Sequence, residues 1–206
     1  MRDGSETRRR IEDEALRLFA QKGVDATSIR DIAMAVGVSE GALYRHTRSK
    51  DELARRLFEE AYADLARAVL AAAPGAPFKT VVPAIIDVFC RLFDSNRNLF
   101  AFLLLAQHGY LARVSADAER NVVEAVKRRL GEAIARGDVR ESDPEVLTAM
   151  VLGVVAQPAI FILYGRIRGT LGAPAGRIAA SVASVCGSDQ PAAEGIPRRS
   201  PVPVRG

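Results

Sequence analysis

The sequence predicts an all-helical protein. Strand signals are scarce, because no alternating run of valine, threonine and tyrosine is bounded by turn dipeptides. Apolar residues instead recur with the i, i+3, i+4 spacing of one helix face along most of the chain. A hydrophobic content of 49% over 206 residues is ample for a core, so disorder of the whole chain is excluded.

The first predicted helix carries an apolar face made of Ile11, Ala15, Leu18 and Phe19. Gly23 follows this face at the position where a glycine commonly ends a helix in the left-handed conformation. The connector VDAT then leads to the next helix.

Two short helices follow the connector. Ser28 and Asp31 form the Ser-x-x-Asp pattern of a capping box, and Gly37 ends that helix after about two turns. Ser39 caps the next helix, which can extend only to about His46. Two short helices joined by a tight Gly-Val turn have the proportions of a helix-turn-helix, whose second helix enters the major groove of DNA.

Longer apolar helices make up the rest of the chain. Ser49 and Glu52 form a second capping box, which begins a long helix that breaks at Pro74. Further helices are expected over the ranges 78–95, 99–108, 115–136, 143–168 and 174–186. The predicted organisation is an N-terminal arm and three-helix DNA-binding domain at 1–56, a larger helical domain at 57–186 and a proline-rich, disordered tail at 187–206.

The composition favours a cytoplasmic protein with an anionic partner. The net charge is +4, although 29 basic residues against 25 acidic ones is a mild excess. Cys90 and Cys186 lie far apart in apolar stretches, so neither a disulfide framework nor a zinc site is predicted, and no metal or cofactor is expected. The polar, arginine-rich N-terminus does not have the pattern of a secretory signal.

One segment leaves a membrane alternative open. The twenty residues from Val146 to Gly165 carry no charge and meet the length criterion for a membrane-spanning helix. Gln157 and Pro158 interrupt the run, and a subunit interface or a central core helix requires the same composition. A membrane-anchored helical protein therefore remains the less favoured interpretation.

The run TSIRDIAMAVGVSEGALYRHTRSKDEL, residues 27–53, resembles the DNA-binding signature of the TetR family of bacterial transcriptional regulators. In that family Gly-Val-Ser, Leu-Tyr-x-His and Ser-Lys-x-x-Leu recur at this spacing. The resemblance implies a repressor that a small hydrophobic or amphipathic ligand releases from a palindromic operator. The alternative is a DNA-binding regulator without a small-molecule switch. An enzyme is not expected, because no local signature joins Cys90, His108 and an acidic partner.

The resemblance also implies which residues meet DNA. Tyr44 and Lys50 match residues that contact the DNA backbone, and His46 lies near the same phosphates. Arg45 and the first residues of the recognition helix would face the groove floor, where arginine suits guanine and Glu40 either accepts from cytosine or caps its helix, the cap being favoured. The complete predicted DNA-binding set is Ser28, Arg30, Ser39, Glu40, Gly41, Ala42, Tyr44, Arg45, His46 and Lys50.

The same resemblance implies a homodimer formed through the last two helices, with a small-molecule pocket among the middle helices. The pocket candidates are aromatic and polar-tipped residues, namely Phe89, Phe93, Phe100, Phe102, Gln107, His108, Tyr110, Gln157, Phe161 and Tyr164. The sequence departs from the family at Thr47, where an aromatic residue, usually Phe, is common. Threonine there predicts a looser or differently packed joint between the recognition helix and the Ser49 helix.

Overall fold

The computed structural model of the protein describes residues 4–111, 114–139 and 143–186. The regular structure within these ranges is helical and includes no strand, which confirms the predicted fold class. The helices of the described part are α1 (Gly4–Lys22), α2 (Ile29–Val36), α3 (Glu40–Leu43), α4 (Lys50–Ala71), α5 (Phe78–Ser95), α6 (Arg97–Tyr110), α7 (Val122–Ala135), α8 (Pro144–Leu163) and α9 (Ala175–Cys186). The predicted tail at 187–206 lies outside the described residues.

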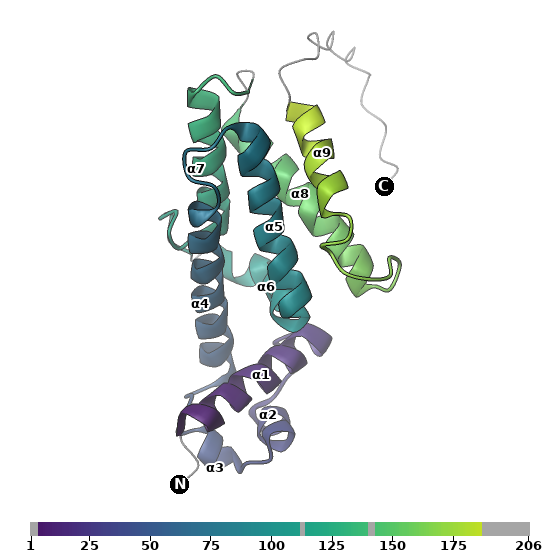
Figure 1. The fold of residues 1–206 in the computed structure, drawn as a ribbon. Coiled ribbons are helices and arrows are strands. Elements are labelled where there is room, and N and C mark those ends of the chain that lie inside the picture. Colours follow the sequence, from purple (N-terminus) through teal and green to yellow (C-terminus); the bar gives the residue numbers. More distant parts are fainter. Residues whose placement is uncertain (1–3, 112–113, 140–142, 187–206) are drawn as a thin grey trace, which may run out of the picture.

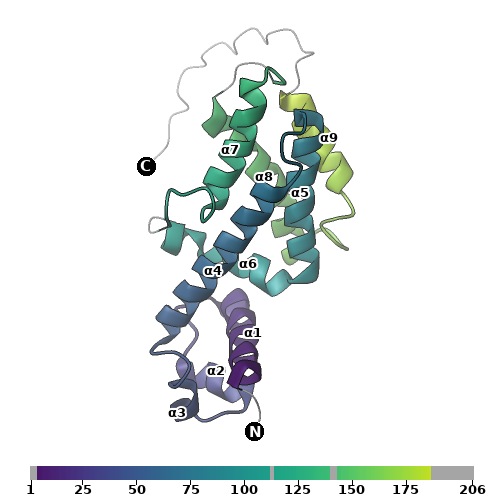
Figure 2. The same cartoon turned by 60° about the vertical axis from the view of Figure 1, so that its left-hand side comes forward.

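Helices α1, α2 and α3 gather at one end of the molecule, which we call the head. Helix α4 runs from the head into a body formed by α5 to α9, as Figure 1 and Figure 2 show from two directions. Within the body α4 packs along α7, and α6 lies against both α1 and α4. Helix α6 is therefore the part of the body that meets the head.

A continuous apolar core joins the head to the body. Phe19 of α1 and Phe102 of α6 pack with ring centroids 5.6 Å apart. Phe58 of α4 meets the same Phe102 ring at 6.2 Å in a nearly perpendicular arrangement. Burial of each such side chain stabilises the fold by about 1.5–3 kcal/mol. These contacts cross the proposed boundary near residue 56, and the division into two domains stays a prediction.

A cationic side chain attaches each end of α4 to another part of the chain. At its start, the Lys50 ammonium donates to the carbonyl oxygens of Val24 and Asp25, each at 2.9 Å. At its end, Arg129 of α7 is buried and donates to the carbonyl oxygens of Ala72 and Ala73. Carbonyls at the end of a helix have no partner within their helix, so the guanidinium supplies donors to two half-buried carbonyls just beyond the last turn of α4.

Helices α6 and α7 begin at asparagine caps that the sequence analysis did not use. The Asn121 side chain accepts from the backbone N–H groups of Val123 and Glu124, at 3.0 and 3.4 Å. Helix α7 therefore starts at Val122, whereas the sequence predicted a start at residue 115. Asn96 likewise accepts from Leu99 N–H at 3.0 Å, which places the start of α6 two residues before its predicted position at 99.

Helix α8 ends five residues before its predicted end at 168. Gly165 adopts a φ of 71°, which a glycine reaches without steric cost. The chain then turns back, and Arg166 N–H donates to the carbonyl oxygen of Phe161 at 2.8 Å. This pattern satisfies the last carbonyls of the helix, so α8 stops at Leu163.

Among the described helices, α8 has the length and composition of a membrane-spanning helix. Its mean hydropathy is 2.3, and 33% of the window is buried within the protein. Large apolar side chains on its outer face remain exposed, namely Val146, Met150 and Phe161. Length and composition alone do not distinguish a span from a helix covered by another protein surface.

The loop between α8 and α9 is attached to the end of α5 through Asp94. The two carboxylate oxygens of Asp94 accept from the backbone N–H groups of Leu171 and Gly172, at 2.8 and 2.9 Å. Arg97 adds a hydrogen bond to the Gly169 carbonyl at 3.1 Å. A Cβ atom at position 172 would lie 2.9 Å from the Asp94 carboxylate, so only glycine fits there without displacement. Asp94 therefore holds the loop that orients α9.

We predict that Asp94→Ala lowers the free energy of unfolding by about 1–2 kcal/mol, because two backbone donors lose a charged acceptor. Urea denaturation followed by circular dichroism measures the change. The matched control is Asp87→Ala on the same helix, which removes an exposed ion pair with Arg91 and should cost less than about 0.5 kcal/mol. Equal effects of the two changes would contradict the role given to Asp94.

Candidate nucleic-acid interface and ligand cavity

Helix α2 begins at a complete capping box, as predicted. The Ser28 hydroxyl accepts from Asp31 N–H at 3.1 Å, and the Asp31 carboxylate accepts from Ser28 N–H at 2.9 Å. The Lys22 ammonium lies 2.8 Å from the same carboxylate, and these hydrogen bonds, the Lys22 one first, hold the pKa of Asp31 well below its usual range. The box thus attaches the end of α1 to the start of α2.

The turn between α2 and α3 has the glycine conformation that the sequence indicates. Gly37 adopts a φ of 75°, and its N–H donates to the carbonyl oxygen of Ala33 at 3.0 Å. Arg10 of α1 donates to the Val36 carbonyl at 2.5 Å, which places a cation at the carboxyl end of α2. Helix α1 therefore supports both ends of α2.

Helix α3 is shorter than predicted. Ser39 caps it by accepting from Ala42 N–H at 3.1 Å, but the regular helix ends at Leu43 and not at His46. The N–H groups of Arg45 and His46 donate to carbonyls three residues back, at 3.3 and 2.8 Å. These bonds tighten the chain into turns after one turn of α-helix.

The side chains of this segment divide into an inner and an outer set. Leu43 is fully buried and anchors the segment to the core, whereas Tyr44 is 53% exposed. The other predicted contact residues on the outer side are exposed or half-buried, namely Ser39, Glu40, Gly41, Ala42, Arg45 and His46. A Cβ atom added at Gly41 would meet nothing within 4 Å, so packing within the protein does not require this glycine.

The predicted residues outside α3 lie beside it. A surface hollow of 520 Å³ is lined by Ser28, Arg30, Glu40, Tyr44 and Lys50, among other residues. It brings together three separate parts of the predicted DNA-binding set: the start of α2, the recognition segment and the start of α4. Of the five, Lys50 has its ammonium group engaged by the two connector carbonyls described above.

Thr47 is buried, and its hydroxyl donates to the Ser49 carbonyl at 2.8 Å. A polar side chain therefore occupies the position where the resembled family commonly has an aromatic one. The hydrogen bond ties the recognition segment to the start of α4, and the expectation of a looser or differently packed joint stays a prediction.

The predicted capping box at the start of α4 is only half formed. Ser49 accepts from Glu52 N–H at 3.1 Å, as expected. The Glu52 carboxylate, however, accepts from Arg48 N–H at 3.0 Å and not from Ser49 N–H. The return bond is therefore displaced by one residue toward the N-terminus.

A cavity of 210 Å³ lies in the body, where α4, α6, α7 and α8 meet α5. Three of the predicted pocket residues line it, namely Phe89, Phe100 and Gln107. The lining that the sequence analysis missed is mainly aliphatic and comes largely from α7 and α8, with Leu65, Val122, Val123, Leu152, Val155 and Ala156 among its members. Their helical spacing is visible in the sequence, but the predicted pocket residues were all aromatic or polar-tipped and did not include these aliphatic ones.

The other predicted pocket residues lie elsewhere. Phe93 packs edge-on against Phe100 in the core, and Phe102 and Tyr110 contact Phe58 at the joint of head and body. Phe161, Gln157 and Tyr164 are exposed along or just beyond α8. His108 belongs to α6, but its side chain lies outside the described part. The structure therefore does not bring the ten candidates into one site.

Tyr62 of α4 supplies a polar group to this cavity. Burial raises the pKa of Tyr62 to about 12, partly opposed by a hydrogen bond from the Val123 backbone, so the phenol is neutral near pH 7. Gln107 is the other polar side chain of the lining, and no lining residue carries a charge at neutral pH. The cavity is therefore chemically suited to an uncharged molecule.

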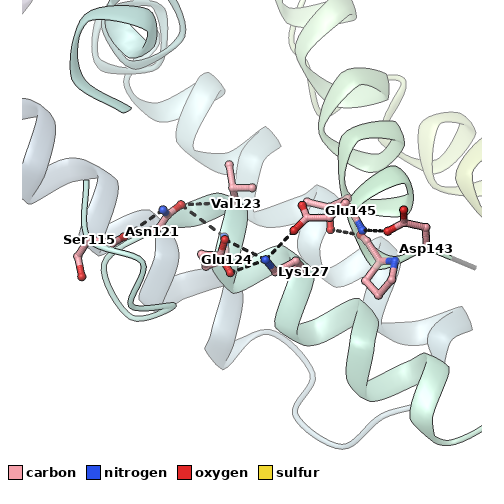
Figure 3. A network of polar contacts seen from close by, with 9 residues as sticks. Ser115, Asn121, Val123, Glu124, Lys127, Asp143 and Glu145 are labelled. Atoms are coloured by element: carbon pink, nitrogen blue, oxygen red, sulfur yellow. Dashed lines mark hydrogen bonds and ion pairs between the residues drawn. The ribbon is translucent and has the colours of Figure 1, made fainter. Parts of the chain in front are cut away.

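A polar network fixes the wall of the cavity formed by α7 (Figure 3). The Lys127 ammonium joins Glu124 of α7 to Glu145 of α8, with nitrogen–oxygen distances of 2.8 Å to each. These hydrogen bonds, the one to Glu124 first, raise the pKa of Lys127 above its usual range. Since Asn121 caps the same helix next to Val123, the first turn of α7 is held from two directions.

Cys90 has the properties of a structural thiol. It is buried, and its Sγ lies 3.5 Å from the Leu171 carbonyl. Burial, with lesser contributions from Asp94 and Asp87, raises the pKa of the Cys90 thiol to about 11. A neutral thiol is a weak nucleophile, which argues against the enzymatic alternative.

Comparison with known proteins agrees with the geometry of the head. Residues 11–57 match the model of the family described as "Bacterial regulatory proteins, tetR family". This segment extends from the middle of α1 to the first turns of α4. The chain therefore contains a TetR-family domain.

The chain is also similar in sequence to several known transcriptional regulators. The chain is 31% identical over 126 residues to the HTH-type transcriptional regulator AcrR of Shigella flexneri, a match that covers 58% of this chain and 59% of AcrR. The chain thus spans about three fifths of that relative's length and smaller shares of other curated relatives. Each of these relatives is named as a transcriptional regulator.

Two solved structures share the fold over most of the chain. A tetR-family regulatory protein from Rhodococcus RHA1 is 20% identical, with a TM-score of 0.71, covering 88% of this chain and 97% of that chain. The regulator FadR from Bacillus subtilis, solved in complex with stearoyl-CoA, is 18% identical, with a TM-score of 0.66, covering 85% and 97%. At these identities the likeness concerns the fold.

We predict that the TetR-family head loses stability in acid through Asp31. Because the folded pKa of Asp31 is lowered, its contribution is present above the ordinary carboxyl value of 3.8 and is lost as the pH falls through the folded pKa. Asp31→Asn should therefore destabilise the protein at pH 7, and the difference from the original chain should shrink below about pH 4.

The urea midpoints of the original chain and of Asp31→Asn, measured between pH 7 and pH 2.5, test the predicted contribution of Asp31. The matched control is Asp13→Asn, a change of an exposed carboxylate on α1 that lies 4.0 Å from Arg9. A stability difference for Asp31→Asn that stays constant across the whole range would exclude the ionised carboxylate as its source.

Proposed function

We propose that the protein is a sequence-specific transcriptional regulator that places its α3 segment in the major groove of an operator. The observation that carries the proposal is the exposed outer face of the recognition segment on a TetR-family helix-turn-helix. Leu43 is buried beneath that face, so the segment can meet DNA without losing its anchor to the core. We propose that it acts in the cytoplasm.

The proposed contacts divide into positioning and reading. Tyr44, with its exposed ring, and His46 lie on the outer side of the recognition segment and would contact phosphates. Arg45 and the residues from Ser39 to Ala42 would meet base edges, with Arg30 of α2 beside them. Lys50 must exchange its bonds to the connector carbonyls for a phosphate oxygen, or it acts by holding the connector in place.

We propose that two copies associate through α8 and α9. A helix with mean hydropathy of 2.3, of which 33% is buried, requires an apolar covering for its outer face. A two-fold dimer supplies that covering with an identical face and presents two recognition segments to one side of DNA. The membrane alternative rests on the same face. Purification of a dimer without detergent would exclude it.

We propose that an uncharged, predominantly apolar ligand in the 210 Å³ cavity releases the protein from DNA. The cavity touches α4 through Tyr62 and Leu65, and α4 leads directly to the recognition segment. A cavity of about 150 Å³ lined by aliphatic and aromatic residues holds benzene in another protein, so a ligand of roughly one ring fits this volume. Stearoyl-CoA, the ligand bound by the FadR relative, is larger and charged, so a different ligand is proposed here.

A DNA-binding regulator without a ligand switch is the second candidate. It is favoured by the hydrogen bonds that hold both ends of α4, because a fixed helix would transmit no movement. A coupling free energy of roughly 1–3 kcal/mol between ligand binding in the cavity and operator binding would distinguish a ligand-controlled regulator from one without a ligand switch.

Selection of binding sites from random duplexes by the purified protein tests the function. We expect a palindrome whose half-sites are about one or more helical turns apart. Arg45→Ala should relax preference at particular base pairs, by roughly 1–3 kcal/mol of discrimination, whereas Tyr44→Phe should weaken binding about equally for all sequences. Recovery of no enriched motif at moderate salt would exclude sequence-specific regulation.

The control for a charge change is Lys79→Ala on α5, in the body, which should leave operator binding unchanged. Lys50→Ala should weaken binding and make the salt dependence shallower. Because Lys50 also holds the connector, its free energy of unfolding must be measured in parallel. Equal loss of base preference in the Tyr44, Arg45 and Lys50 variants would contradict the division of roles.

A thermal-shift screen of uncharged and charged single-ring compounds tests the ligand proposal, with operator release as the second measurement. We expect hits among uncharged compounds. Ala156→Phe should abolish their binding by filling the cavity, and Gln107→Leu should weaken ligands with a hydrogen-bonding group roughly 2- to 13-fold. The matched control for the first change is Ala135→Phe at the exposed end of α7, outside the cavity and the proposed dimer interface. Hits that bind Ala156→Phe unchanged would place their site elsewhere.

A further inference from the structure

A second cavity lies at the joint between the head and the body. Its volume is 760 Å³, against 210 Å³ for the cavity in the body. Its walls come from the end of α1, the connector to α2, the start of α4 and the face of α6. It shares no lining residue with the cavity assigned above to the ligand that releases DNA.

The floor of this joint cavity is apolar. Phe19 of α1 and Phe102 of α6 form its base, and Leu105 and Tyr110 of α6 extend it. Leu105 is 54% exposed, an unusual state for a leucine at the meeting point of four chain segments. An apolar group placed in the cavity would cover this side chain and gain the free energy of its removal from water.

The rim of the joint cavity is acidic. Asp25, Asp51 and Glu52 contribute carboxylates. The carboxylates of Asp25 and Asp51 make no hydrogen bond or ion pair with any residue in the described ranges, and that of Glu52 accepts a backbone N–H from Arg48.

The two basic groups of the rim have partners of their own. Lys22 pairs with Asp31 at 2.8 Å, and Arg55 pairs with Glu59 at 3.0 Å. Their charges are therefore largely balanced by carboxylates outside the cavity. An anion in the cavity would face three carboxylates, whereas a cation would find two of them without a partner.

We propose that the joint cavity binds an organic cation with an apolar body, such as a quaternary ammonium or amidinium compound. The apolar body lies on Leu105 and the aromatic floor, and the charged group lies between Asp25 and Asp51. The bound cation contacts the α1–α2 connector and α6 at once, so it joins the head to the body. This site shares no lining residue with the proposed effector cavity, whereas Asp25 and Ala26 also line the hollow beside the recognition segment.

The probe for the test is octyltrimethylammonium below its micelle concentration, and isothermal titration calorimetry on the full chain measures its binding. We expect one site per chain, weaker binding at higher salt, and much weaker binding of the uncharged octyl glucoside and the anionic octyl sulfate. Hydrogen exchange of the amides at 23–26 should slow when the probe is bound, because the connector forms one wall.

The double variant Asp25→Asn with Asp51→Asn should weaken the probe roughly 5- to 30-fold, since an exposed ion pair contributes a few-fold to a binding constant. Glu119→Gln, which removes an exposed carboxylate away from the cavity, is the matched control and should bind normally. Circular dichroism of each variant verifies that it is folded.

The following outcomes would overturn the proposal. They are unchanged affinity in the double variant, an equal loss in Glu119→Gln, and equal binding of octyl glucoside. Loss of binding in Ala156→Phe, with the double variant unaffected, would move the probe to the body cavity and also overturn it. None of these results depends on whether the protein recognises an operator.

Discussion

The rest of the structure depends on the aromatic contacts made by Phe58 at the joint of head and body. This fully buried ring packs at 5.1 Å from Tyr62, at 5.0 Å from Tyr110 and at 6.2 Å from Phe102, which in turn meets Phe19 of α1. Aromatic pairs add roughly 0.5–1.5 kcal/mol each beyond their burial. Because these contacts come from α1, α4 and α6, they place the recognition segment, the body cavity and the joint cavity relative to one another.

The head could be predicted in detail because its signals are local. Ser28, Asp31, Gly37 and Ser39 act on residues three or four positions away, and each makes the contact that its sequence context indicates. The end of α3 was predicted too late, since Arg45 and His46 have ordinary helical sequence preferences, and the tighter hydrogen bonds after Leu43 have no local sequence signal. Lys50 shows the same limit, because its partners lie 25 and 26 residues away.

The body was predictable in its helices and not in its cavities. Apolar periodicity located α5 to its last residue, whereas the asparagine caps of α6 and α7 were overlooked. Which apolar residues border empty space is decided by packing between helices distant in sequence, and aromatic character proved a poor guide to it. Phe93 fills space in the core, while Leu152 and Val155 surround the cavity. The spacing of apolar residues along the sequence does not show which of them border unfilled space.

The contact of Arg129 with the end of α4 bears on the order in which the chain folds. Its guanidinium reaches Ala72 and Ala73 across 57 and 56 residues of sequence, whereas the start of α4 is attached to a connector about half that distance away. Contacts at short separation close first, because the entropy lost in closing the loop is smaller. The head can therefore complete its attachment to α4 while the far end of that helix is still fraying, and the helix becomes a rigid rod only after α7 has docked.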